Sequence, residues 1–373
     1  MSAPVAATAL HDACAACLRH SWLLGELGAV LDRLSGDRAR LLAALELGEE
    51  QLLAALGGRR RGELERRLAS LDASALRPPD GIAAICRHHA GYPQALRAAA
   101  APRMLFHTGP QGRLAELCMG PVVAILGGRR ASDYGSELAR GLGRGLSASG
   151  VTVASTLRGA IAAGARSGAA EVSATSIACA AAGLGGQSAA ASARRGPRVS
   201  TDACTVSELP SGCSGRRWGL IAGERVLVEL CSVLVVVEAE DAPRELACAL
   251  LARGRSRCVV ATPGRVSSPL SSGPHVLVRA GAELVRGAAD VLELLDRAPG
   301  PRIAGAHEPG SGLRPLLRET LERIRNGCET PEELCRGAHD PGAVLLALSE
   351  LELMGLLFRG GTGRYLPRSP HPQ

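Results

Sequence analysis

The strongest constraint on the fold is a series of short uncharged segments that alternate with helical stretches. Three of these segments, 122–126, 151–155 and 233–237, are rich in β-branched residues. Helical patterning lies between and after them, at 136–149 and 243–253. Uncharged segments of this length are typical of strands buried on both faces of a parallel sheet. Their alternation with helices predicts βαβ units, so we expect an α/β fold with a doubly wound, mostly parallel sheet.

The sequence on either side of this region has a different pattern. Leucines at helical spacing predict a small helical module over residues 1–76, which leaves 77–297 for the sheet-containing core. Residues 298–312 are rich in proline and glycine and are predicted to be a linker. The last segment, 313–373, reads as three helices followed by a β-hairpin, which is the pattern of a winged helix.

Charge and composition narrow the classes of function. All 43 basic residues are arginine, against 36 acidic residues, and the formal net charge is +7. Arginine binds phosphate in a bidentate manner, so a basic surface of this kind favours polyanions, although a GC-rich genome would produce the same excess. No apolar run is long enough to cross a bilayer, and residues 1–10 lack the basic segment of a signal peptide. We therefore expect a cytoplasmic protein with no membrane partner.

Most of the twelve cysteines are scattered through apolar stretches, as expected of reduced thiols in the cytosol. Two short pairs differ, because Cys14 and Cys17 are three residues apart and Cys86 is two residues before His88. Four nitrogen and sulfur ligands in two such pairs could form a tetrahedral structural zinc site between the helical module and the core. The alternative is ordinary thiols beside a solvated histidine. No other cofactor is expected.

A glycine-rich turn follows the first uncharged segment. Gly127 and Gly128 end the predicted strand, and a helix follows. Such a corner presents backbone N–H groups and the positive end of a helix to an anion, and Arg129, Arg130 and Ser132 could add donors to phosphate. The spacing is not that of a dinucleotide fingerprint. The alternative is a tight turn whose arginines are solvated.

Longer strings on both sides of this turn are similar to one known family. They are Gly91-Tyr92-Pro93, residues 127–135, residues 235–239 and residues 263–269. Their order and spacing resemble the DNA-processing protein A (DprA/Smf) family over roughly residues 80–297. The resemblance implies a Rossmann-like core, preceded by a SAM-like helical module and followed by a winged helix.

The resemblance also implies a function. Members of the family bind single-stranded DNA, protect incoming DNA and load the RecA recombinase onto it in natural transformation, and they have no established catalytic residues. The phosphate pocket of the family would lie at Gly127, Arg129 and Ser132, and Arg225 is the one residue retained from a basic segment. We therefore expect a non-enzymatic DNA-binding protein, with RecA as its protein partner and a homodimer as its assembly.

Several positions depart from the family pattern. Arg166 stands where the family has a histidine, and Arg158 is a second added cation, so both could compensate for lost contacts, although we expect them to be solvated. Glu224 replaces an asparagine and would repel phosphate. Arg225 could instead pair with Glu224 or Glu229. A degenerate relative that no longer binds DNA therefore remains an alternative.

Two further alternatives remain open. A phosphoribohydrolase-like enzyme on the same fold would need a carboxylate beside the phosphate turn, and Glu208 or Glu238 are the candidates. A regulator acting through the winged helix would prefer duplex DNA. The third predicted helix of that segment, 341–354, has no arginine, which argues against docking in the major groove.

Overall fold

The structure is a computed structural model. The residues that it describes are 11–72, 76–98, 100–110, 112–128, 130–172, 175–185, 203–240, 243–297, 315–325, 328, 330–336, 340–353, 357–359 and 364–367. The chain forms two compact units, Met1–Ala304 and Gly305–Gln373. The predicted linker at 298–312 lies outside the described residues. Of the helices within the described ranges, none is both long and apolar enough to cross a bilayer.

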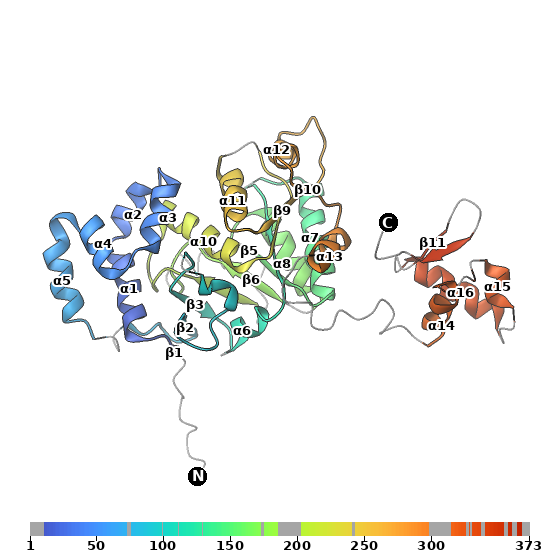
Figure 1. The fold of residues 1–373 in the computed structure, drawn as a ribbon, viewed down its shortest axis with the longest axis horizontal. Helices are drawn as coiled ribbons and strands as arrows, with labels where there is room; N and C mark the ends of the chain where they lie inside the picture. The colour runs from blue at the N-terminus through green and yellow to red at the C-terminus, as the bar shows by residue number, and fades with distance from the viewer. Residues whose placement is uncertain are drawn as a thin grey trace, which may run out of the picture. The chain divides into compact units, whose positions relative to one another are not determined.

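The first unit is built on a ten-stranded sheet with the order β1-β2-β3-β7-β6-β5-β4-β8-β9-β10 (Figure 1). The strands are β1 (His11–Asp12), β2 (Ile82–Cys86), β3 (Met104–Thr108), β4 (Val122–Leu126), β5 (Thr152–Thr156), β6 (Ser176–Cys179), β7 (Cys204–Ser207), β8 (Val233–Val236), β9 (Cys258–Ala261) and β10 (Glu283–Leu284). All neighbours from β7 to β10 are parallel, and β3 is antiparallel to β2 and β7. The expected α/β fold with a mostly parallel sheet is confirmed.

Helices cover both faces of this sheet (Figure 1). One face carries α6 (Arg113–Leu117), α10 (Arg216–Leu230), α11 (Pro243–Gly254) and α12 (Ser272–Arg279); the other carries α7 (Asp133–Ala148), α8 (Ala160–Ala170) and α13 (Ala288–Arg297). Side chains alternate between the faces along a strand, so Leu126 of β4 packs with the first group of helices and Ile125 with the second. Both residues are almost completely buried, which explains the uncharged sequence of the strand.

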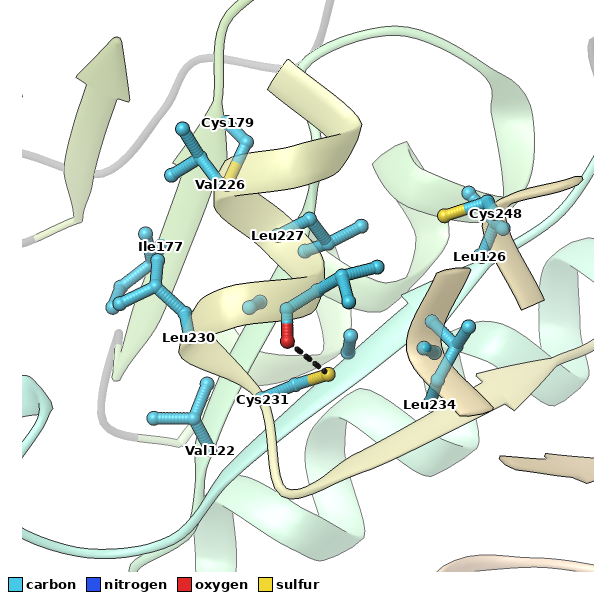
Figure 2. Packing of buried hydrophobic residues seen from close by; sticks show 14 of the residues in the cluster. Val122, Leu126, Ile177, Cys179, Val226, Leu227, Leu230, Cys231, Leu234 and Cys248 are labelled. Carbon is cyan, nitrogen blue, oxygen red and sulfur yellow. Dashed lines mark hydrogen bonds between the residues drawn. The ribbon is translucent and has the colours of Figure 1, made fainter. Parts of the chain in front are cut away.

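Helix α10 packs against the sheet through its apolar side chains. Figure 2 shows Val226 and Leu230 of this helix close to Cys179 and Ile177 of β6, and Leu227 belongs to the same apolar cluster. These α10 side chains are at most 2% exposed, and burying each stabilises the fold by about 1.5–3 kcal/mol. The helix ends at Leu230, and the thiol of its C-cap residue, Cys231, donates to the carbonyl of Val228 at 3.5 Å (Figure 2). The polar residues of α10 are therefore held on a rigid support.

The N-terminal helices pack on the outer side of α10. They are α1 (Ala15–Glu26), α2 (Gly28–Leu34), α3 (Arg38–Glu46), α4 (Glu49–Leu56) and α5 (Arg61–Ala69). Their buried leucines form one apolar cluster with Leu209, Trp218 and Ala222. The carboxylate of Asp32 in α2 also accepts from the backbone N–H of Arg217 at 2.9 Å. The helical module and the sheet belong to the same compact unit.

Helices α7 and α8 lie against each other at backbone distance. A Cβ atom at Gly143 of α7 would overlap the carbonyl of Ala165, and one at Gly168 of α8 would overlap the carbonyl of Arg140. Only glycine permits this approach, because each overlap is with backbone that cannot rotate away. The contact fixes the corner after β4 relative to the corner after β5.

The second unit contains α14 (Pro315–Arg325), α15 (Pro331–Cys335), α16 (Pro341–Leu353) and an antiparallel pair, β11 (Leu357–Arg359) and β12 (Tyr365–Pro367). Thr330 caps α15, and its hydroxyl accepts from the backbone N–H of Glu333 while the carboxylate of Glu333 accepts from the Thr330 N–H. Three helices and a hairpin are the elements that the sequence predicted, and the winged-helix arrangement stays a prediction.

Candidate nucleic-acid interface

A cavity of about 480 Å³ lies at the carboxyl ends of β4, β5 and β6. Leu126, Thr156 and Cys179, the last residues of these neighbouring strands, contribute to its wall. The other lining residues are Gly127, Gly128, Leu157, Arg158, Gly159, Ala181, Leu220, Gly223 and Glu224. Open α/β sheets bind ligands outside the carboxyl ends of their strands, and the volume is within the range of small-ligand sites.

Four of the residues that line the cavity are glycines. A Cβ atom at Gly127 would overlap the side chain of Ile161 in α8, so glycine is required for this helix to approach the end of β4. Gly159 precedes α8 as its N-cap residue with a φ of +105°, a conformation that disfavours other residues. The first turn of α8 therefore begins at the cavity, where its N–H groups and the helix dipole favour an anion.

Two arginines place positive charge beside this helix end. Arg158 lines the cavity and is exposed. Arg166 is 7% exposed, and its guanidinium donates to the Ser155 hydroxyl at 2.9 Å and to the carbonyls of Thr156 and Leu157. Burial lowers the pKa of Arg166 to about 10, so it remains charged at neutral pH. The expectation that Arg166 is solvated was wrong: it supports the loop that forms one wall of the cavity.

Glu224, which replaces an asparagine of the family pattern, also lines the cavity. Its side chain is 1% exposed, and Oε2 accepts from Nη1 of Arg38 in α3 at 2.7 Å. An ion pair of this geometry compensates most of the negative charge. The negative charge of Glu224, which was expected to repel phosphate, is therefore balanced by Arg38 of the helical module.

The corner after β4 holds a carboxylate of the chain itself. Ser132 caps α7 by accepting from the N–H of Gly135 at 3.1 Å. Glu238, in the loop after β8, accepts from the Ser132 N–H at 2.8 Å and from its hydroxyl at 2.6 Å. Since Glu238 is 5% exposed, this internal acid takes the position in which an external phosphate was predicted. The two donors of Ser132 at the start of α7 are therefore engaged within the protein, whereas the residue that precedes α8 lines the cavity.

The remaining arginines of the predicted site lie in different environments. Arg130 is 79% exposed and pairs with Glu240. Arg129 lies outside the described residues. Arg225 is 2% exposed, and its Nη1 donates to Oε2 of Glu208 at 2.7 Å, so the structure places it in the core and not at the cavity. The acids that the sequence suggested as partners of Arg225 were Glu224 and Glu229, and Glu208 was not one of them.

The four predicted metal ligands, Cys14, Cys17, Cys86 and His88, lie together elsewhere in the first unit, and none of them lines this cavity. Sequence reasoning missed Gly159, although a glycine between an uncharged strand and an alanine-rich helix is a usable signal for a βα turn. It also missed Arg38 as the partner of Glu224, and no local pattern identifies a contact across 186 residues.

Comparison with known proteins agrees with this fold. The family model of DNA recombination-mediator protein A matches residues 83–296. The chain is 31% identical over 260 residues to the putative DNA processing protein DprA of Mycobacterium tuberculosis, which covers 68% of this chain and 66% of that protein. It is 30% identical over 192 residues to the DNA processing protein DprA of Streptococcus pneumoniae, covering 52% of this chain and again 66% of the relative. The matched part thus spans just under two thirds of these relatives.

A solved structure extends the comparison to three dimensions. The X-ray structure of DNA processing protein A from Streptococcus pneumoniae superposes with a TM-score of 0.58 at 24% sequence identity. The superposition covers 74% of this chain and 95% of the other, so the two share a fold. Since the family model accounts for more than half of the sequence, this chain belongs to the DNA recombination-mediator protein A (DprA/Smf) family.

Proposed function

We propose that this protein binds the sugar-phosphate backbone of single-stranded DNA at the cavity beside β4, β5 and β6. The observation that carries the proposal is the joint placement of the α8 N-terminus, the glycine-lined wall and the charges of Arg158 and Arg166. Backbone N–H groups and guanidinium groups are the usual partners of phosphate oxygens. The net charge of +7 adds a long-range attraction for a polyanion.

The binding is proposed to be weakly selective for sequence. Aromatic residues make up 2% of the chain, so few rings are available to stack on bases. Contacts to phosphate set position and affinity but do not read bases. Affinity should therefore depend on salt more than on the sequence of the strand.

We further propose that the protein protects incoming DNA, passes it to the RecA recombinase and works as a homodimer. Membership of a family described as recombination mediators supports the transfer to a recombinase. The test is to add the protein to single-stranded DNA covered by a single-strand-binding protein and to follow RecA filament formation, with light scattering for oligomeric state. A filament rate that the protein does not change would contradict the transfer.

The alternative of a phosphoribohydrolase-like enzyme gains little support. Its candidate carboxylates were Glu208 and Glu238, and each is bound to a side chain of the protein itself, to Arg225 and to Ser132. Neither is among the described residues that line the cavity. Release of free base from nucleoside monophosphates in the presence of the protein would revive this alternative.

The binding site is tested by fluorescence anisotropy with a labelled oligothymidine at several salt concentrations. Arg158→Ala should weaken binding. It should also make the slope of log affinity against log salt concentration shallower by about one unit, because one phosphate contact is lost. Arg158→Glu should weaken it further, and Arg129→Ala should act in the same direction as Arg158→Ala. Arg286→Ala is the matched control, because Arg286 is also exposed, at 77%, but pairs with Asp290 away from the cavity lining.

The outcome that contradicts the proposed site is equal binding by the Arg158 variants and the Arg286 control. A preference of the unmodified protein for duplex DNA would favour recognition through the second unit instead.

A further inference from the structure

We infer that Cys14, Cys17, Cys86 and His88 form a structural zinc site that fastens the N-terminal helical segment to the edge of the sheet. Each residue offers one ligand atom, and the four atoms all lie within 4.8 Å of one another. Cys14 and Cys17 belong to the start of the helical module, whereas Cys86 ends β2 and His88 lies in the turn after it. One ion would therefore join segments about 70 residues apart in sequence.

The fold explains why these residues meet. Strand β1 pairs in parallel with β2, with His11 opposite Ala84 and Asp12 opposite Ile85. The chain that leaves β1 therefore arrives at the carboxyl end of β2, where Cys86 is the last strand residue. The backbone N–H of Cys14 donates to Sγ of Cys86 at 3.4 Å.

The spacing within the first pair follows from helix geometry. Cys14 is the N-cap residue of α1, and Cys17 lies in its first turn. Residues three apart at the start of a helix face the same side, so both thiols are directed to the same point. This is a common arrangement of paired ligands in structural zinc sites.

The distances around His88 fit a shared cation. Its Nδ1 lies 3.3 Å from Sγ of Cys14, 3.4 Å from Sγ of Cys17 and 3.8 Å from Sγ of Cys86. Tetrahedral zinc with its usual bond lengths would place sulfur and nitrogen ligands roughly 3.5 Å apart. Hydrogen bonds account for the cluster less well, because one imidazole nitrogen carries one proton or one lone pair and cannot serve three thiols at once.

The donor set indicates a structural role. Three thiolates and one imidazole complete four-coordination, which leaves no open position for a substrate or a reactive water. Cys17 and Cys86 are buried, at 4% and 1% exposed, so the ion would be largely shielded from solvent. Closing the long segment between the two ligand pairs would also restrict the unfolded chain and stabilise the folded one.

The test is metal analysis of the purified full-length protein by mass spectrometry. One zinc per chain is expected, and Cys14→Ser and His88→Ala should each lower the zinc content severalfold. Both residues are at the surface, which limits the effect of these changes on packing. Cys213→Ser is the matched control, because Cys213 is a half-buried free cysteine of the same unit that lies outside the cluster, and it should retain the zinc.

Cobalt gives a second measurement that does not depend on the variants. Protein refolded with Co²⁺ should show the intense visible bands of a tetrahedral thiolate complex, and added Zn²⁺ should abolish them. The inference is overturned if the unmodified protein is folded by circular dichroism yet takes up neither ion, or if Cys213→Ser loses as much zinc as Cys14→Ser.

Discussion

The buried ion pair between Arg225 and Glu208 makes a prediction that separates a core residue from a DNA ligand. Arg225→Met removes the guanidinium while it keeps most of the side-chain volume. Glu208 would then be a buried carboxylate without its cation, since its Oε2 accepts from Arg225 and its Oε1 has no hydrogen-bond partner among the described residues. The carbonyl of Ala100 would also lose two N–H donors.

The magnitude follows from the geometry. At 2.7 Å and an effective dielectric constant near 20, the attraction between the charges is about 6 kcal/mol, most of which offsets the cost of burying both ions. Removing one member of such a pair costs about 3–5 kcal/mol, because the remaining charge stays buried. Arg225→Met combined with Glu208→Leu should recover most of this loss, leaving about 1 kcal/mol for the unpaired carbonyl.

Urea denaturation of the single variants and the double variant measures these free energies of unfolding. Arg225→Met should leave the salt dependence of DNA binding unchanged, because its side chain does not reach the cavity. A single-variant cost below about 1 kcal/mol would refute the reasoning about the buried charge. If Arg225→Met instead makes the slope of log affinity against log salt concentration shallower by about one unit, Arg225 contacts phosphate, as the family resemblance implied.

Three further predictions concern the elements around the cavity. Ser132→Ala removes both the cap of α7 and a hydrogen bond to a buried carboxylate, so the free energy of unfolding should fall by about 2–4 kcal/mol; a change below 1 kcal/mol in urea denaturation would contradict this. Gly143→Ala should destabilise the fold by about 1–3 kcal/mol, because the added Cβ overlaps α8. Gly141 has open space around it, so Gly141→Ala should stabilise the fold by up to about 1 kcal/mol. Similar melting temperatures of the two variants would refute the close helix contact. Burial, with a smaller effect from nearby arginines, lowers the pKa of His20 to about 4. The unfolded chain therefore binds more protons below pH 6.5, and the free energy of unfolding should fall by about 2 kcal/mol from pH 7.5 to pH 5. His20→Gln should flatten this pH profile relative to the unmodified protein.

The strands at the centre of the sheet could be predicted because their sequences have one explanation. The segment 122–126 contains no charged residue. The structure places β4 over the same residues, and all five are buried. Strand β7 was missed because its four residues, Cys204–Ser207, include two hydroxyl side chains and give no periodic signal. Strands β2 and β3 were missed as well, since the antiparallel pairing that defines them is not local in sequence.

The sequence placed the candidate site at the corner after β4, whereas the cavity also extends to the ends of β5 and β6, and its side-chain partners were not predicted. Its place after β4 and β5 follows from the strand order, because ligand sites lie at the carboxyl ends of parallel strands. The capture of Ser132 by Glu238 joins residues 106 positions apart, so no spacing rule identifies it. The sequence suggested an acid of the same helix as the ion-pair partner of Arg225. In the structure the partner is Glu208, in the loop after β7.

The apolar cluster shared by the N-terminal helices and α10 limits how the chain can be divided. Trp218 is 2% exposed, and it packs in one cluster with leucines of the first 70 residues, Leu209 and Ala222. A truncated protein that starts at residue 77 would expose much of the roughly 200 Å² of this aromatic side chain, and such patches promote aggregation. The N-terminal helices and the sheet should therefore unfold in one cooperative transition. The N-terminal helices are thus part of the core of this unit and not a separable domain.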